Sequence, residues 1–201
     1  MMVTINTKKC YTPQEYLERE LTAEIRSEYS QGVLTPMAGA SPAHNGIYFS
    51  TAGTLWSQLV STECRGFGQD MRVRVPECDR YYYPDIVVIC GEPHYEDTKY
   101  GVLLNPKLII EILSPSTEQK DRGEKFDCYE TLKSLTDYLL ISQTEPRIEH
   151  FSRSENGGWN FVAARGLNGV LNLPSIGCTL RLADIYARVA FPPPPVEESE
   201  K

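Results

Sequence analysis

The sequence predicts a mixed α/β (α+β) fold, with one central β-sheet flanked by helices. Two apolar runs carry this prediction, residues 86–90 (IVVIC) and 108–113 (LIIEIL). Both have strand length and lack polar alternation, which is typical of strands covered on both faces. Helix start signals precede and follow these runs. The 201 residues are 41% hydrophobic and 23% charged, as in an ordinary globular protein of about one domain.

Two helices and a hairpin are predicted before the first apolar run. Thr12 and Ser41 are each followed by proline, which is typical of a helix start. Glu15 completes a capping box with Thr12, so we expect a short helix to about residue 19. The second helix is amphipathic and extends to about residue 61. Residues 25–37 read as a β-hairpin that turns at Gly32.

The rest of the chain alternates strands, loops and helices. Further strands are predicted at residues 66–69, 71–75, 138–141, 147–151 and 159–163, with a hairpin turn at 156–158. Helices are predicted at residues 123–133 and 182–189, and a surface loop at 91–105. Residues 191–201 are proline-rich and acidic, so we expect a disordered tail after a single domain formed by residues 1–190.

Charge and hydropathy exclude several classes of protein. The formal net charge is −7, which argues against nonspecific coating of nucleic acid. It does not exclude an enzyme whose groove holds carboxylates and metal ions, because bound cations invert the local field. No apolar run approaches the roughly 20 residues of a membrane span. The N-terminus has no apolar leader, so we expect a cytoplasmic protein.

The six cysteines are scattered along the sequence and form no CxxC pair. A zinc site needs clustered thiolates and imidazoles, so none is predicted. A disulfide framework is not expected in a cytoplasmic chain of this size. We therefore interpret the cysteines as buried or incidental thiols.

Two carboxylates occupy positions where acids are costly. Asp85 opens the first apolar run, and Glu111 lies inside the second. A buried carboxylate is unfavourable unless it is paired or binds a metal. Strand ends that lie side by side would bring both acids together in an oxygen-rich site suited to Mg²⁺ or Mn²⁺. Alternatively, Asp85 accepts backbone N–H bonds at a strand entry, and Glu111 forms a buried salt bridge.

Lys125 follows the Glu111 strand at a distance suited to the next helix. An ammonium group beside a metal site can orient water and stabilise a phosphorane. The surrounding run, residues 121–125 (DRGEK), is charge-balanced. It is also compatible with simple ion pairs between side chains three or four residues apart.

These segments resemble a known family, the Uma-two-type restriction endonucleases of the PD-(D/E)XK nuclease-like superfamily. The similarity covers roughly residues 12 to 187. Its most specific segments are Tyr83-Pro84-Asp85, residues 108–117 (LIIEILSPST) and residues 121–126 (DRGEKF). Further matches are Glu28-Tyr29 with Gly32, and residues 37–45, 70–73 and 134–138.

The resemblance implies a restriction-endonuclease-like core with a metal site at the strand ends. Asp85 would be the Asp of PD, and Glu111 the acid of (D/E)XK. Together with the carbonyl of Ile112 they would hold Mg²⁺ or Mn²⁺. The chain departs from the superfamily at the motif lysine, which is Leu113 here. The lysine function would then move to Lys125 on the following helix, with Lys120 as the alternative.

Two further positions match the family outside the sheet core. His44, near the start of its helix, is expected to contact a phosphate or act as an auxiliary base; otherwise it is a hydrogen-bonding residue of the helix start. Glu28 is expected to be a third metal ligand or to bond to His44. His94 and His150 have no chemical partners nearby in the sequence, and we interpret them as surface residues.

The resemblance implies a metal-dependent endonuclease that hydrolyses DNA phosphodiester bonds, acting as a homodimer. A second hypothesis is a catalytically weak or inactive nuclease-fold protein that serves as a nucleic-acid or protein interaction module. The acidic net charge and the missing motif lysine favour this second hypothesis. Paired carboxylates also suit a glycosidase, but no aromatic-rich subsite pattern surrounds either acid.

Overall fold

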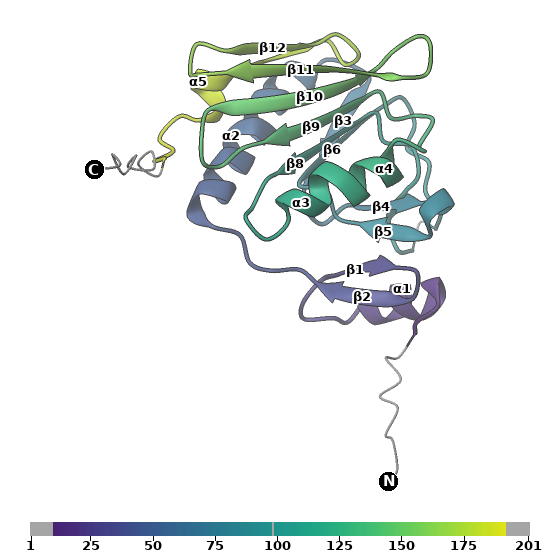
Figure 1. Cartoon of the computed structure of the whole chain (residues 1–201). Coiled ribbons are helices and arrows are strands. Elements are labelled where there is room, and N and C mark those ends of the chain that lie inside the picture. Colours follow the sequence, from purple (N-terminus) through teal and green to yellow (C-terminus); the bar gives the residue numbers. More distant parts are fainter. Residues whose placement is uncertain (1–9, 98, 192–201) are drawn as a thin grey trace, which may run out of the picture.

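A computed structural model describes residues 10–97 and 99–191. Its centre is a six-stranded sheet with strand order β11-β10-β9-β8-β6-β3 (Figure 1). These strands are β11 (Trp159–Arg165), β10 (Arg147–Arg153), β9 (Asp137–Ile141), β8 (Leu108–Ile112), β6 (Ile86–Cys90) and β3 (Cys64–Phe67). The predicted tail, from residue 192 onwards, lies outside the described residues, as do residues 1–9.

The two apolar runs form β6 and β8 at the centre of this sheet, as predicted. They pair antiparallel with Ile86 opposite Ile110, whereas β8 pairs parallel with β9. The sheet is therefore mixed. All five residues of β8 are buried, because layers of side chains cover both faces.

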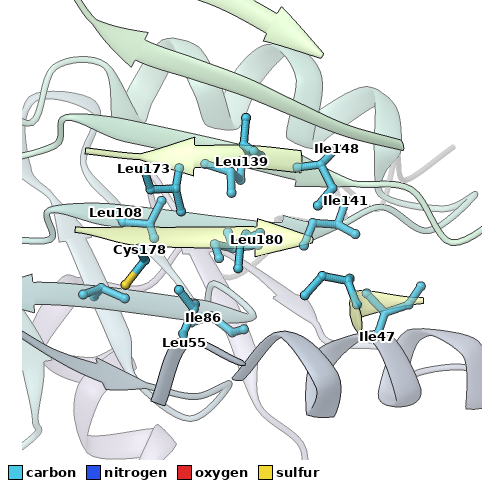
Figure 2. Packing of buried hydrophobic residues seen from close by; sticks show 14 of the residues in the cluster. Ile47, Leu55, Ile86, Leu108, Leu139, Ile141, Ile148, Leu173, Cys178 and Leu180 are labelled. Atoms are coloured by element: carbon cyan, nitrogen blue, oxygen red, sulfur yellow. The ribbon is translucent and has the colours of Figure 1, made fainter. Parts of the chain in front are cut away.

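The side-chain alternation of β8 divides its residues between two cores. Even-numbered residues such as Leu108 and Ile110 face α2 (Pro42–Leu59) and α5 (Leu182–Ile185) (Figure 2). Ile109 faces the opposite core, which contains side chains of α4 (Phe126–Tyr129). Because side chains alternate along a strand, Glu111 points to the same face as Ile109. The chain thus places a carboxylate inside a largely apolar layer.

Two smaller sheets complete the fold, and of their strands the sequence predicts the first hairpin and residues 71–75. The five-stranded sheet has the order β2-β1-β5-β4-β7, and β12 pairs with β13. The strands are β1 (Ser27–Ser30), β2 (Val33–Pro36), β4 (Arg72–Val75), β5 (Arg80–Tyr82), β7 (Val102–Leu103), β12 (Val170–Leu173) and β13 (Cys178–Arg181). The predicted loop at residues 91–105 contains β7, which is too short to give a periodic signal.

The first, second and last helices start as predicted, but the third does not, and several helices end elsewhere. The capping box of Thr12 and Glu15 is present at the start of α1 (Pro13–Glu20). The helix predicted at residues 123–133 is replaced by three short pieces. They are α3 (Glu118–Lys120), a π-helical turn (Asp121–Lys125) and α4, which ends at Tyr129. α5 is four residues long rather than eight.

Two expectations about single residues are wrong. Cys64 is disulfide-bonded to Cys90, and Cys78 to Cys128. Cys64 and Cys90 lie directly opposite each other on the paired strands β3 and β6. Their separation in the sequence gives no sign of this proximity. Disulfides are typical of oxidising compartments, so the cytoplasmic location stays a prediction. In the described part of the chain, no helix is long and apolar enough to cross a membrane.

His150 is buried rather than on the surface. It is 4% exposed and lies 2.6 Å from Asp137, across the β9–β10 pair. Asp137 also accepts hydrogen bonds from Ser175 and Thr136. Although burial alone would raise the pKa of Asp137, its hydrogen bonds with His150, Ser175 and Thr136 hold that pKa below its usual value. Ser175 belongs to the β12–β13 turn, so Asp137 ties this hairpin to the central sheet.

We expect Asp137→Asn to lower the free energy of unfolding at pH 7 by about 1–3 kcal/mol. Because the folded-state pKa of Asp137 is depressed, its contribution exists above the unfolded pKa of about 3.9 and is lost as the pH falls through the folded value. Urea unfolding of both proteins between pH 7 and pH 3 measures this. A stability difference that stays constant over this range would contradict the assigned role.

Candidate functional site

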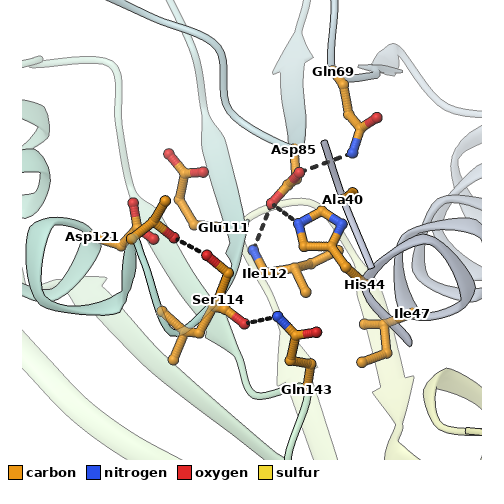
Figure 3. A network of polar contacts seen from close by, with 12 residues as sticks. Ala40, His44, Ile47, Gln69, Asp85, Glu111, Ile112, Ser114, Asp121 and Gln143 are labelled. Carbon is orange, nitrogen blue, oxygen red and sulfur yellow. Dashed lines mark hydrogen bonds and ion pairs between the residues drawn. The ribbon is translucent and has the colours of Figure 1, made fainter. Parts of the chain in front are cut away.

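The candidate site lies where β6 begins and β8 ends. These antiparallel strands pair Ile86 with Ile110, so Asp85 and Glu111, one residue beyond that pair, lie at the same end of the sheet. Figure 3 shows both carboxylates there, with His44 of α2 on the side of Asp85. The predicted proximity of the two strand ends is therefore present.

Three hydrogen-bonding groups fix the Asp85 carboxylate. Its Oδ2 accepts a hydrogen bond from the backbone N–H of Ile112 at 2.7 Å, and its Oδ1 accepts one from Gln69 at 3.0 Å. His44 Nε2 lies 3.3 Å from Oδ2. The backbone contact is the alternative predicted for a strand-entry aspartate. It also sets the carboxylate in one orientation beside the end of β8.

Lys125 points into the protein rather than into solvent. The residue is 5% exposed, and its Nζ lies 3.0 Å from Glu28, 3.1 Å from Glu111 and 3.1 Å from Asp121. The π-helical turn that carries Lys125 directs it toward the sheet, and such turns are frequent at functional sites. The structure thus joins Lys125 to Glu111, as expected for a displaced motif lysine. The catalytic role of Lys125 stays a prediction.

Glu28 is bound by two lysines rather than by His44, so the expected Glu28–His44 bond is wrong. Lys120 Nζ lies 2.6 Å from Glu28 Oε2, and Lys125 contacts Oε1. The imidazole of His44 instead contacts Asp85. Although burial alone would raise the pKa of Glu28, the ammonium groups of Lys125 and Lys120 hold that pKa below its usual value.

Negative charge exceeds positive charge around Lys125. Four carboxylates surround the site but only two ammonium groups, those of Lys120 and Lys125; the acids are Glu28, Asp85, Glu111 and Asp121. Burial raises the pKa of Glu111 well above its usual value. Lys125 opposes this shift, and the other three acids add to it. The surplus negative charge is the electrostatic condition that favours binding of a divalent cation.

Glu111 keeps one carboxylate oxygen free for a further contact. Lys125 and Tyr129 both donate to Oε1, at 3.1 Å and 3.2 Å. No described residue donates a hydrogen bond to Oε2. Oε2 is therefore open to a metal ion or an ordered water, both of which bind carboxylate oxygens.

The oxygen atoms at the strand ends suit an ion such as Mg²⁺, which keeps part of its water shell, better than a metal whose ligands are all side chains. Within residues 10–97 and 99–191, no three His, Cys, Asp or Glu side chains are arranged to hold a metal ion. Mg²⁺ retains several waters and commonly uses only one or two protein carboxylates. Asp85, Glu111 and the carbonyl of Ile112 match that pattern. Glu28, with both oxygens on lysines, is poorly placed as a third ligand.

Four side chains of this region were not predicted from the sequence to belong to the site. Tyr129 and Asp121 contact the buried carboxylate or its lysine, and Gln69 holds Asp85. Gln143 donates to the carbonyl of Leu113 at 2.7 Å and accepts from Ser41, which caps α2 (Figure 3). Only Asp121 had a signal, because its spacing of four residues from Lys125 is that of a helical ion pair.

Comparison with known proteins places this site within a family. The sequence profile of the Uma2 family, described as "Putative restriction endonuclease", matches residues 13–183. The chain belongs to the Uma2 family. The matched segment contains every candidate residue of the site, from Glu28 to Lys125.

Two relatives of this Uma2 protein come from Synechocystis sp., and both are described as uncharacterised. One is 37% identical over 83% of this chain and 94% of its own length. The other is 31% identical over 90% of this chain and 93% of its own length. A crystal structure from Anabaena variabilis, described as that of a "putative nuclease belonging to DUF820", aligns with a TM-score of 0.71. It is 20% identical and covers 88% of this chain and 97% of that one, so it supports the fold alone.

The raised pKa of Glu111 predicts that its charge destabilises the metal-free protein. In EDTA at pH 7, we expect Glu111→Gln to raise the free energy of unfolding by about 1–3 kcal/mol. Lys125→Met leaves Glu111 and Asp121 without a cation and is expected to lower the free energy of unfolding by about 3–5 kcal/mol. Thermal and urea unfolding measure both effects.

The sign of the Glu111 effect depends on pH. A raised folded-state pKa means that Glu111 takes up a proton as the pH falls, and it then resembles glutamine in charge. The advantage of Glu111→Gln should therefore shrink toward acidic pH. A variant less stable than wild type at pH 7 would show that the carboxylate charge stabilises the fold.

Proposed function

We propose that this Uma2 protein is a metal-dependent endonuclease that hydrolyses phosphodiester bonds in DNA. The observation that carries the proposal is the buried ammonium group of Lys125 beside Glu111, at the strand ends where Asp85 also lies. Membership of a family described as "Putative restriction endonuclease" supports hydrolysis of nucleic acid. Mg²⁺ or Mn²⁺ would be held by Asp85, Glu111 and the carbonyl of Ile112.

The bound cation would activate water and stabilise the charge that develops on the phosphate. The chain's own residues prepare the site for that chemistry. The Ile112 N–H and Gln69 hold Asp85 in a fixed orientation, so little reorganisation accompanies the reaction. Lys125 supplies a positive charge in a water-poor environment, where its attraction for a phosphorane oxygen is strong.

His44 is suited to accept a proton at its second ring nitrogen. Nε2 faces Asp85, whereas Nδ1 is buried and finds no hydrogen-bond partner among the described residues. Asp85 can therefore fix the tautomer in which Nε2 carries the proton and Nδ1 accepts one. This leaves Nδ1 available as the auxiliary base expected from the sequence.

A catalytically weak or inactive interaction module remains the second candidate. Leu113 occupies the motif position of the lysine and is 4% exposed in the apolar core. Lys125, its proposed substitute, is already surrounded by three carboxylates. If no cation displaces that arrangement, the ammonium group is neutralised and has little charge to offer a phosphate.

Plasmid cleavage with Mg²⁺ or Mn²⁺ distinguishes the two candidates. We expect nicking or linearisation by the wild-type protein. Asp85→Asn and Glu111→Gln should each lower the rate by about a thousandfold, since losing a metal ligand removes several kcal/mol of transition-state stabilisation.

The matched control is Asp70→Asn. The Asp70 side chain is 84% exposed and contacts Arg26 at the surface, so the substitution should leave the rate within about twofold of wild type. Cleavage that is equal in all variants would refute the assigned site. Wild-type protein that binds DNA but does not cleave it with either metal would favour the interaction module.

A further inference from the structure

The outer face of α2 is apolar, uncharged and exposed. Phe49, Trp56 and Val60 are 80%, 68% and 62% exposed, although each is a large apolar side chain. The helix contains no Asp, Glu, Lys or Arg in its 18 residues. Exposed apolar surface without charge is characteristic of the centre of a protein–protein interface.

The exposed residues follow a heptad pattern in which small and large residues alternate. Gly46, Phe49, Gly53, Trp56 and Val60 are spaced by three and four residues, which places them in one stripe along the helix. Both glycines are exposed, and glycine is a poor former of helix interiors. A Cβ added at either position would meet no neighbouring described atom within 4 Å. The described part of the protomer therefore gives no steric reason for either glycine.

We propose that this stripe, Pro42 to Val60 on the outer face of α2, is the interface of a homodimer in which two α2 helices pack antiparallel. A two-fold axis near residue 51 brings every large residue opposite a small or narrow one. Phe49 then meets the partner's Gly53, Trp56 meets the partner's Gly46, and Val60 meets the partner's Pro42. Each contact occurs twice, as a symmetric interface requires. The glycines accept the aromatic side chains as knobs in holes.

Electrostatics favour this antiparallel arrangement over a parallel one. The first turn of α2 has no acidic residue and the last turn no basic residue, so nothing in the helix offsets its dipole. In the antiparallel pair, the positive end of one helix lies beside the negative end of the other. Glu63 and Arg65, just beyond α2, line the groove next to Trp56 and give the patch both signs of charge at its edge.

The available area is compatible with a stable dimer. An aromatic side chain has roughly 150–250 Å² of surface. At their exposed fractions, Phe49 and Trp56 together therefore expose roughly 250–350 Å². That is about a third or more of the ~800 Å² that each partner of a standard interface buries. A cavity of about 750 Å³ between α2 and β3, lined by Trp56 and Val60, adjoins the stripe and extends the contact surface.

This dimer does not depend on the proposed nuclease activity, although it bears on it. His44 lies in the first turn of α2, and the proposed register places it opposite the partner's Gln58. The two His44 residues would then lie about 21 Å apart along the helix axes, at a rise of 1.5 Å per residue. Each dimer would then contain two copies of the candidate functional site.

Sedimentation velocity of the full chain in EDTA without DNA tests the proposal. We expect a wild-type dimer, and Trp56→Glu should raise its dissociation constant at least about 30-fold, as for an aromatic interface hot spot. Gly53→Leu has open space in the protomer but would collide with the partner's Phe49. It should weaken the dimer at least about tenfold while circular dichroism shows an intact fold.

The matched control is Phe161→Glu, which removes another half-exposed aromatic residue, on β11. This variant should remain a dimer. A wild-type monomer at high micromolar concentration would overturn the proposal. So would a dimer that tolerates both α2 substitutions, or one that is dissociated by Phe161→Glu instead.

Discussion

The structure depends on one buried ion-pair cluster, the ammonium group of Lys125 among the carboxylates of Glu28, Glu111 and Asp121. Burial alone would lower the pKa of Lys125, but these three acids raise it well above its usual value, so the lysine stays charged. Because each acid comes from a different element, the cluster joins β1, β8 and the π-helical turn. A charged group is costly to bury unless it has this many partners, and perturbed pKa values of this kind cluster at functional sites.

The sequence predicted the elements with strong local signals. The capping box at Thr12, the proline-marked start of α2 and the apolar runs of β6 and β8 are all present. Short strands such as β7 have too few residues for a period. The disulfides and the Asp137–His150 pair depend on contacts between distant segments, which spacing does not reveal.

The acids of the candidate site could be predicted from the sequence, but their hydrogen-bond and ion-pair partners could not. Asp85 and Glu111 stand out because acids interrupt or open apolar runs, and family resemblance singled out Lys125. The predicted partner of Glu28 was wrong, because two lysines rather than His44 contact its carboxylate. Gln69 and Gln143 are ordinary polar residues in the sequence and acquire a role only when loops bring them to the strand ends.

We infer that the surplus of carboxylates over ammonium groups forms a site for a divalent cation. Isothermal titration calorimetry with Mn²⁺ tests it directly, without DNA and without catalysis. We expect about one ion per chain in the wild-type protein, and heats of binding that are lost in both Asp85→Asn and Glu111→Gln. Binding unchanged in these two variants, or absent from the folded wild-type protein, would contradict it.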